Sequence, residues 1–162
     1  MMHGKLMLAA AAAASLSACG LFHHSAPAVQ LSQGEVALHS TWHATLSSPS
    51  DLAGAMQVSG QASMGPESNH DKTRVSLTLR NATPGGVHPW EIHHGQCDTD
   101  AGIIGQADAY PPIKIANDGT GSAEATLPLV TPDSGSYFIA VRASTANPDL
   151  VVACGNFAPP TP

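Results

Sequence analysis

The chain has 162 residues, of which 43% are hydrophobic, and this is enough apolar material for the core of one domain. Charged residues make up 11%, while 15 glycines and 13 prolines supply many turn-forming positions, and this composition argues against long helices and coiled coils. The formal net charge of −6 leaves no basic surface to displace counterions from phosphates, which argues against nucleic acid as a partner. The nine histidines outnumber the six lysines and arginines, so histidine is where we look for chemistry.

Residues 1–18 are predicted to be the signal peptide of an exported protein. Lys5 precedes an apolar run from Leu6 to Ala14, which is far shorter than the ~20 residues that a membrane-spanning helix needs. The next residues, Leu16-Ser17-Ala18-Cys19, resemble the lipobox of bacterial lipoproteins, in which the cysteine becomes the lipid-bearing N-terminus. We therefore expect lipid attachment at Cys19 and a membrane anchor in the bacterial cell envelope, at the outer membrane or its periplasmic face. An ordinary signal peptide with a chance cysteine is the alternative.

A change of pattern near residue 35 predicts where the folded domain begins. Residues 19–34 show no periodicity, and we expect a flexible tether there. From 35 to 162 short alternating runs lie between turn signals, which predicts one all-β domain, an eight-stranded Greek-key barrel or sandwich. The expected strands are Trp42 to Ser47, Met56 to Met64, Arg74 to Arg80, Val87 to His94, Pro111 to Ala116, Ala123 to Leu129, Tyr137 to Arg142 and Leu150 to Ala153.

The remaining cysteines predict a covalent link. With Cys19 assigned to the lipid anchor, Cys97 and Cys154 are left in an exported chain, and disulfides persist in such compartments. We therefore expect a disulfide between them, which the chain-entropy model values at ~4 kcal/mol. Two free thiols are the alternative.

The most informative stretch runs from Gly86 to Cys97 and reads GVHPWEIHHGQC. In an extended strand alternate side chains share a face, so Glu91 and His93 lie on one side, roughly 7 Å apart. Trp90 and Ile92 then point to the other side, into the core. An imidazole and a carboxylate on one strand face can hold a single metal ion, and imidazole suits copper or zinc.

Two further histidines could join such a site. His88 and His94 have the parity of the core face, but each lies near a strand end, from which it could turn outward. A polar strand end with solvated histidines is the alternative to a metal site. The candidate metal ligands are therefore His93, Glu91, His94 and His88.

Three stretches in this order resemble the copper/zinc superoxide dismutase family, its bacterial periplasmic branch in particular. The first is Val87 to His94 with Cys97 after it, where the family has Leu-His-Gly-Phe-His-Val-His-Glu and its first disulfide cysteine. The second is Ile115 to Ala123, which matches the family's hairpin with an Asp-Gly turn. The third is Tyr137 to Arg142 with Val152-Ala153-Cys154-Gly155 after it, where the family has a strand ending Val-Val-His and later Leu-Ala-Cys-Gly. The resemblance implies an eight-stranded Greek-key β-barrel with one disulfide.

The resemblance also locates the expected copper ligands. Glu91 stands where the first histidine of the family's His-x-His pair belongs, His93 matches the second, and Arg142 stands in place of a late-strand histidine. No histidine lies between Cys97 and Asp118, where the family's bridging histidine and its other zinc ligands should be. One copper ion therefore remains possible, and zinc is not expected.

We expect Glu91 and Arg142 to form an ion pair across neighbouring strands, in place of a metal bridge. This predicts an envelope lipoprotein whose superoxide dismutase-like domain lacks the full metal site and acts as a metal- or partner-binding module, with the protein partner unknown. Whether it is also an enzyme is left open, because the alternative is a divergent copper-only dismutase that uses His93, His94 and His88.

Acidic residues close to the histidine-rich strand favour the binding module. Asp98, Asp100 and Asp108 follow this strand in the sequence. A dismutase benefits from positive charge that draws in the superoxide anion, and carboxylates would repel that anion. The same carboxylates could instead concentrate metal cations.

Overall fold

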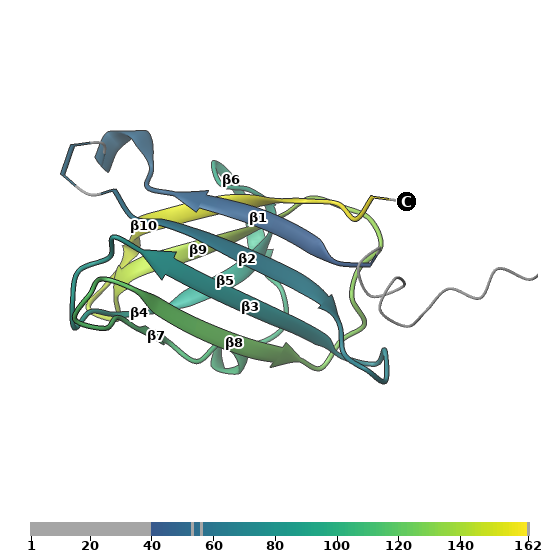
Figure 1. The fold of residues 1–162 in the computed structure, drawn as a ribbon. Coiled ribbons are helices and arrows are strands. Elements are labelled where there is room, and N and C mark those ends of the chain that lie inside the picture. Colours follow the sequence, from purple (N-terminus) through teal and green to yellow (C-terminus); the bar gives the residue numbers. More distant parts are fainter. Residues whose placement is uncertain (1–39, 53, 56, 162) are drawn as a thin grey trace, which may run out of the picture. The chain divides into compact units, whose positions relative to one another are not determined.

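Alternating apolar and polar residues form a curled antiparallel sheet in the computed structural model, which describes residues 40–52, 54, 55 and 57–161 (Figure 1). In β3 (Thr73–Arg80), for example, Val75, Leu77 and Leu79 are buried while the residues between them are more exposed. The predicted all-β class is confirmed, because the described residues form strands, turns and two 3-10 helices, η1 (Ser50–Leu52) and η2 (Ala107–Ala109). The other strands are β1 (Trp42–Ser47), β2 (Ser59–Pro66), β4 (Val87–His88), β5 (Trp90–Gln96), β6 (Thr99–Ile103), β7 (Ile113–Lys114), β8 (Gly121–Leu127), β9 (Tyr137–Ser144) and β10 (Asn147–Ala158).

The main sheet has eight strands in the order β6-β5-β9-β10-β1-β2-β3-β8, and every pair in it is antiparallel. The sheet curls into a half-barrel, so that β5 and β9 lie behind β2 and β3 in Figure 1. Its inner face carries the core, and its outer face carries the polar residues that alternate with the core residues along each strand.

Several sequence predictions lie outside the described residues. These are the signal peptide 1–18, the lipid attachment site Cys19 and the tether 19–34, while the predicted domain 35–162 is described from residue 40 onward. Within the described part of the chain, no helix is both long enough and apolar enough to cross a bilayer.

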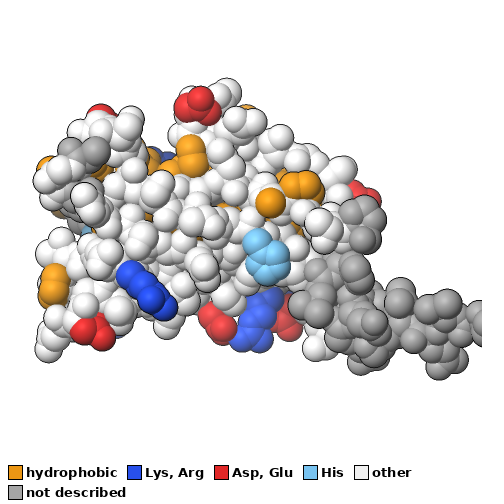
Figure 2. All heavy atoms as spheres, turned by 45° about the horizontal axis from the view of Figure 1, so that its top comes forward, with side chains coloured by type: hydrophobic (Ala, Val, Ile, Leu, Met, Phe, Trp, Pro, Cys, Tyr) orange, Lys and Arg blue, Asp and Glu red, His pale blue; other side chains and the backbone are white. Residues whose placement is uncertain are grey.

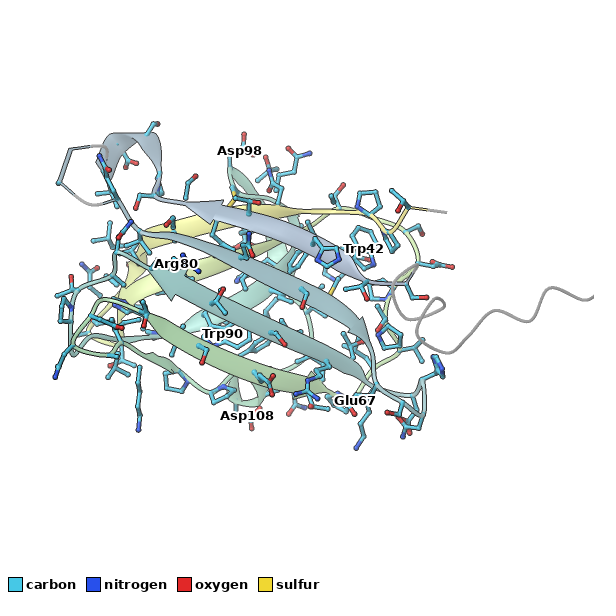
Figure 3. All side chains as sticks on the ribbon, viewed as in Figure 1. Trp42, Glu67, Arg80, Trp90, Asp98 and Asp108 are labelled. Carbon is cyan, nitrogen blue, oxygen red and sulfur yellow. A yellow bond between two sulfur atoms is a disulfide. The ribbon has the colours of Figure 1, made fainter. Side chains whose placement is uncertain are left out.

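Two tryptophans lie between the two sides of the curled sheet (Figure 3). Trp42 packs edge-on against Tyr137 with ring centroids 5.2 Å apart, and Trp90 packs in the same way against Tyr110 at 5.1 Å. Both indoles are fully buried, yet both N–H groups donate hydrogen bonds, Trp42 to the Pro132 carbonyl at 2.8 Å and Trp90 to the Pro111 carbonyl at 2.7 Å. Burial of these rings thus costs no unsatisfied donor.

Residues 104–116 lead from β6 through η2 and β7, and they add Ile104, Tyr110, Ile113 and Ile115 to the core. The Ile104 amide donates to the Ile92 carbonyl at 2.8 Å, and the Tyr110 hydroxyl donates to the Ile104 carbonyl at 2.7 Å. Because the Tyr110 ring is buried, desolvation raises the pKa of its hydroxyl, which therefore stays protonated and keeps this donor. Within this segment, β7 pairs with β4, and these two strands form the second, smaller sheet.

The observed strands differ from the predicted ones at Pro89 and after His94. The predicted strand Val87 to His94 is split at Pro89 into β4 and β5, because proline has no N–H to give to a ladder. The Pro89 carbonyl still accepts a hydrogen bond from the Arg142 amide at 2.8 Å. Beyond His94, β5 continues to Gln96 and turns into β6, a strand that the sequence analysis did not predict.

The predicted disulfide between Cys97 and Cys154 is confirmed. Cys97 lies in the turn from β5 to β6, and Cys154 lies in β10 opposite Ala140 of β9. The Cys97 amide also donates to the side-chain oxygen of Asn156 at 2.9 Å. These two links fasten the β5–β6 turn to β10.

Loss of this disulfide is expected to destabilise the domain. The two cysteines are 57 residues apart in sequence, and the chain-entropy model gives ~4 kcal/mol for a loop of this size. We predict that the double substitution Cys97→Ala, Cys154→Ala lowers the free energy of unfolding, measured by urea denaturation, by a few kcal/mol. Unfolding at the same urea concentration in the wild-type and substituted chains would contradict this prediction.

Candidate functional site

The outer face of β5 and β9 carries two buried rings, whereas the outer face of a sheet is usually exposed to solvent. His93 of β5 lies directly opposite Phe138 of β9, and the two rings stack with centroids 5.1 Å apart and planes at 23°. His93 is only 5% exposed and Phe138 only 3%, although neither belongs to the core inside the sheet. The fastened β5–β6 turn and the edge strand β6 flank this pair of rings.

The imidazole of His93 lies between two carboxylates. Its Nδ1 is 2.9 Å from the Asp100 carboxylate of β6, and its Nε2 is 3.3 Å from the Glu91 carboxylate of the same strand. Because an ionised carboxylate only accepts hydrogen bonds, Nδ1 carries a hydrogen atom and donates a hydrogen bond to Asp100. The Nε2 atom is buried and, despite its closeness to Glu91, makes no well-aligned hydrogen bond.

Asp100 is held in turn by the backbone of its own strand. Its Oδ1 accepts a hydrogen bond from the Gly102 amide at 2.7 Å in addition to the one from His93. The pKa of Asp100 is lowered, chiefly by the Gly102 hydrogen bond and also by His93 and the positive charge of Arg142. The carboxylate is therefore ionised at neutral pH and provides a fixed acceptor for His93.

The predicted ion pair between Glu91 and Arg142 is not formed. In the described residues the Glu91 carboxylate lies 3.3 Å from Nε2 of His93 and forms no ion pair with Arg142. The register gives the reason: Glu91 lies opposite Ala140, whereas Arg142 lies one outer-face position further along β9, where its amide reaches Pro89. Arg142 is thus a diagonal neighbour of Glu91, and its charge acts on Asp100.

The other two predicted ligands point elsewhere. The Nδ1 atom of His88 is 3.0 Å from the Arg142 carbonyl, and its Nε2 is buried without a partner. His94 is exposed and lies against the Tyr137 ring, 5.3 Å between centroids, on the opposite face of β5 from His93. The four predicted ligands therefore do not converge, and no group of three or more His, Cys, Asp or Glu within the described ranges could hold a metal ion.

Asp100 and Phe138 contact His93, but neither was predicted as a site residue. The sequence analysis noted Asp100 as an acidic residue near the strand, and Phe138 as part of the strand from Tyr137 to Arg142. The expected disulfide was the one signal that could have brought Asp100 to the outer face, because it fixes the turn that leads into β6.

No protein-family model and no curated protein matches this chain. Function must therefore be argued from the residues and the geometry of the cluster formed by Glu91, His93, Asp100 and Phe138, which we call the His93 cluster.

The His93 cluster predicts an acid-sensitive contribution to stability. Since the folded state lowers the pKa of Asp100 below its ordinary 3.8, the folded state binds this proton less tightly than the unfolded state. The stabilisation is therefore complete above pH ~4 and is lost as the pH falls through the lowered value. We predict that Asp100→Asn lowers the free energy of unfolding at pH 7 and flattens its decline as the pH falls below ~4, measured by urea denaturation.

Asp98→Asn is the matched control. Asp98 lies at the tip of the β5–β6 turn (Figure 3) and accepts a hydrogen bond at 3.2 Å from the neighbouring Thr99 hydroxyl. If Asp98→Asn flattened the acid limb as much as Asp100→Asn, the assignment to the His93 cluster would be wrong.

Proposed function

We propose that this chain is a lipid-anchored protein of the bacterial envelope, with a superoxide dismutase-like barrel that acts as a binding module and not as a dismutase. Three lines of support are independent of each other: the arrangement of the strands, the positions of the three matching stretches, and the donor set at the expected copper position. Lipid attachment at Cys19 and the envelope location rest on the sequence of the first 20 residues alone.

The strand arrangement supports a Greek-key connection. In this motif three strands follow one another and the fourth returns by a long connection to lie beside the first. Here β9 lies beside β5, β4 pairs with β7, and a turn joins β7 to β8, while residues 128–136 carry the chain from β8 back to β9. If β4 and β5 are taken as one strand interrupted by Pro89, the return of the chain to β9 beside β5 supports such a connection, although β7 pairs with β4 and not with β8.

The three stretches that resemble the dismutase family form defined elements of this fold, and two of the stretches form neighbouring strands. The first forms β4 and β5, the third forms β9 and the middle of β10, and these strands are neighbours joined by the disulfide. The second forms the β7–β8 turn, in which the Asp118 carboxylate accepts hydrogen bonds from the amide and the hydroxyl of Thr120. Position and pairing thus support a common fold with that family.

The donor set at the expected copper position does not fit the family's copper. That site would draw on the positions of Glu91, His93 and Arg142, and these supply one imidazole, one carboxylate and a cation that opposes a bound metal ion. The Nδ1 atom of the imidazole donates to Asp100, so Nε2 is the one ring nitrogen left for an ion. We therefore derive no redox step for this chain.

The observation that carries the proposal is that the buried ring of His93 is held through Nδ1 by Asp100 of its own chain, with Glu91 as its other polar neighbour. A buried imidazole that is fixed in this way stabilises the covering of the outer face and keeps β6 in place. The barrel is retained as a scaffold, and its surfaces are left to bind partners. One observation favours the alternative, a copper-only enzyme: the buried Nε2 of His93 lacks a hydrogen bond and could offer its lone pair to one ion beside Glu91.

Copper loading of the purified chain distinguishes the binding module from the copper-only enzyme. We predict that addition of copper gives no superoxide dismutation above that of the same amount of free copper. The double substitution Glu91→His, Arg142→His restores imidazoles at the two replaced positions beside His93. It should raise copper affinity, measured by competition with a chelator, by about tenfold or more, the scale of single-residue effects at metal sites.

The control is Glu124→His, Arg74→His, which exchanges another acid and base on neighbouring strands. These two residues form an exposed ion pair at 2.6 Å on β8 and β3, and their replacement should leave copper affinity unchanged. One tightly bound copper with fast dismutation in the unaltered chain would overturn the proposal in favour of the enzyme.

A further inference from the structure

A second feature lies at the end of β3, on residues that the His93 cluster does not use. There the end of β3 and the β7–β8 hairpin border an open groove of roughly 650 Å³. Its lining includes Arg80 and Asn81 on one side and Lys114 and Thr120 on the other, with Ser122 of β8 among the remaining residues. Arg80 lies at the end of its strand in Figure 3.

The two cations in this groove are exposed and have no acidic partner. Arg80 and Lys114 take part in none of the ion pairs found in the described part of the chain, whereas Arg74, on the same strand as Arg80, is paired with Glu124. Charged side chains are sparse on the face shown in Figure 2, and the chain as a whole is acidic. The two unpaired cations therefore make this groove locally positive on a chain whose net charge is negative.

The backbone fixes Lys114 close to β8. Gly121 begins β8, and a Cβ atom there would lie 2.8 Å from the Lys114 carbonyl oxygen, closer than such atoms approach. Only glycine lets β7 approach β8 this closely, and β7 is also held by its pairing with β4. The position of Lys114 relative to Ser122 is therefore set by the fold and does not depend on a flexible loop.

The one carboxylate in the groove is engaged by its own turn. Asp118 accepts hydrogen bonds from the Thr120 amide at 3.0 Å and from the Thr120 hydroxyl at 2.7 Å. These bonds lower the pKa of Asp118, which is therefore ionised at neutral pH and offsets one of the two positive charges. The groove keeps a net positive charge, together with neutral donors on Asn81 and Ser122.

We propose that this groove binds a phosphate group. A guanidinium, an ammonium and the Ser122 hydroxyl suit the several oxygens of a phosphate, which can accept from all of them at once, whereas a carboxylate has only two oxygens. The phosphate could be free or could be an ester at the end of a larger molecule such as a lipid headgroup.

The test is an NMR titration of the ¹⁵N-labelled chain at constant ionic strength, with inorganic phosphate in one arm and glycerol 3-phosphate in the other. Backbone shifts centred on residues 78–82 and 114–122 are expected in both arms, and sodium chloride in place of phosphate should not reproduce them. Tighter binding of glycerol 3-phosphate points to an ester, and tighter binding of inorganic phosphate points to the free ion. No shifts at these residues in either arm would overturn the proposal.

Variants of matched charge sharpen the test. Arg80→Gln, Lys114→Gln should weaken phosphate binding about tenfold or more, because it removes two charge-assisted hydrogen bonds. Asp118→Asn should tighten binding, since the amide oxygen can still accept from Thr120 while the negative charge is lost. Lys72→Gln, Arg74→Gln removes the same total charge from the start of β3 and should have little effect. An equal loss of affinity in the two Gln pairs would overturn the proposal in favour of non-specific attraction.

Discussion

The link between the β5–β6 turn and β10 is the constraint on which the outer face of this curled sheet depends. The Cys97–Cys154 bond fastens the turn before β6 to β10 covalently, and the Cys97 amide adds a hydrogen bond to Asn156. With them in place, Asp100 is brought to His93, and a histidine and a phenylalanine are buried on the side of the sheet that faces away from the core. A disulfide, a hydrogen bond and a stacked pair of rings thus stabilise one another.

This arrangement is the physical basis for proposing a binding module in place of a dismutase. A metal-binding histidine must present a free lone pair to the ion, and its neighbours must not carry positive charge. Here the charged neighbours of His93 are the carboxylates of Glu91 and Asp100 and, on the next strand, the cation Arg142, and neither His88 nor His94 reaches the ring. The proposed loss of copper chemistry follows from these three side chains, while the fold itself is compatible with either outcome.

Much of the fold could be predicted from the sequence, but less of the candidate site could be. The alternation in β3 and the Asp-Gly turn before β8 predict their structures because each depends on local residues. The burial of His93 could not be predicted, because it depends on β6, whose residues 99–103 are mostly exposed and show no alternation. The ion pair expected between Glu91 and Arg142 failed for a related reason: parity assigns residues to a face, but only the register decides that Arg142 is a diagonal neighbour and that His93 is nearer.

The state of the His93 ring nitrogens tests the central claim most directly. In the ¹⁵N NMR spectrum of the labelled chain at neutral pH, we predict an Nδ1 proton that is protected from exchange with solvent. The resonances of this ring should also persist when Cu(II) is added in less than equimolar amount. Exposed histidines such as His70 serve as the internal reference, since any weak surface binding of copper would broaden them first. Selective loss of the His93 signals at low copper, with those of His70 intact, would show that the ring is a metal ligand and would contradict the account.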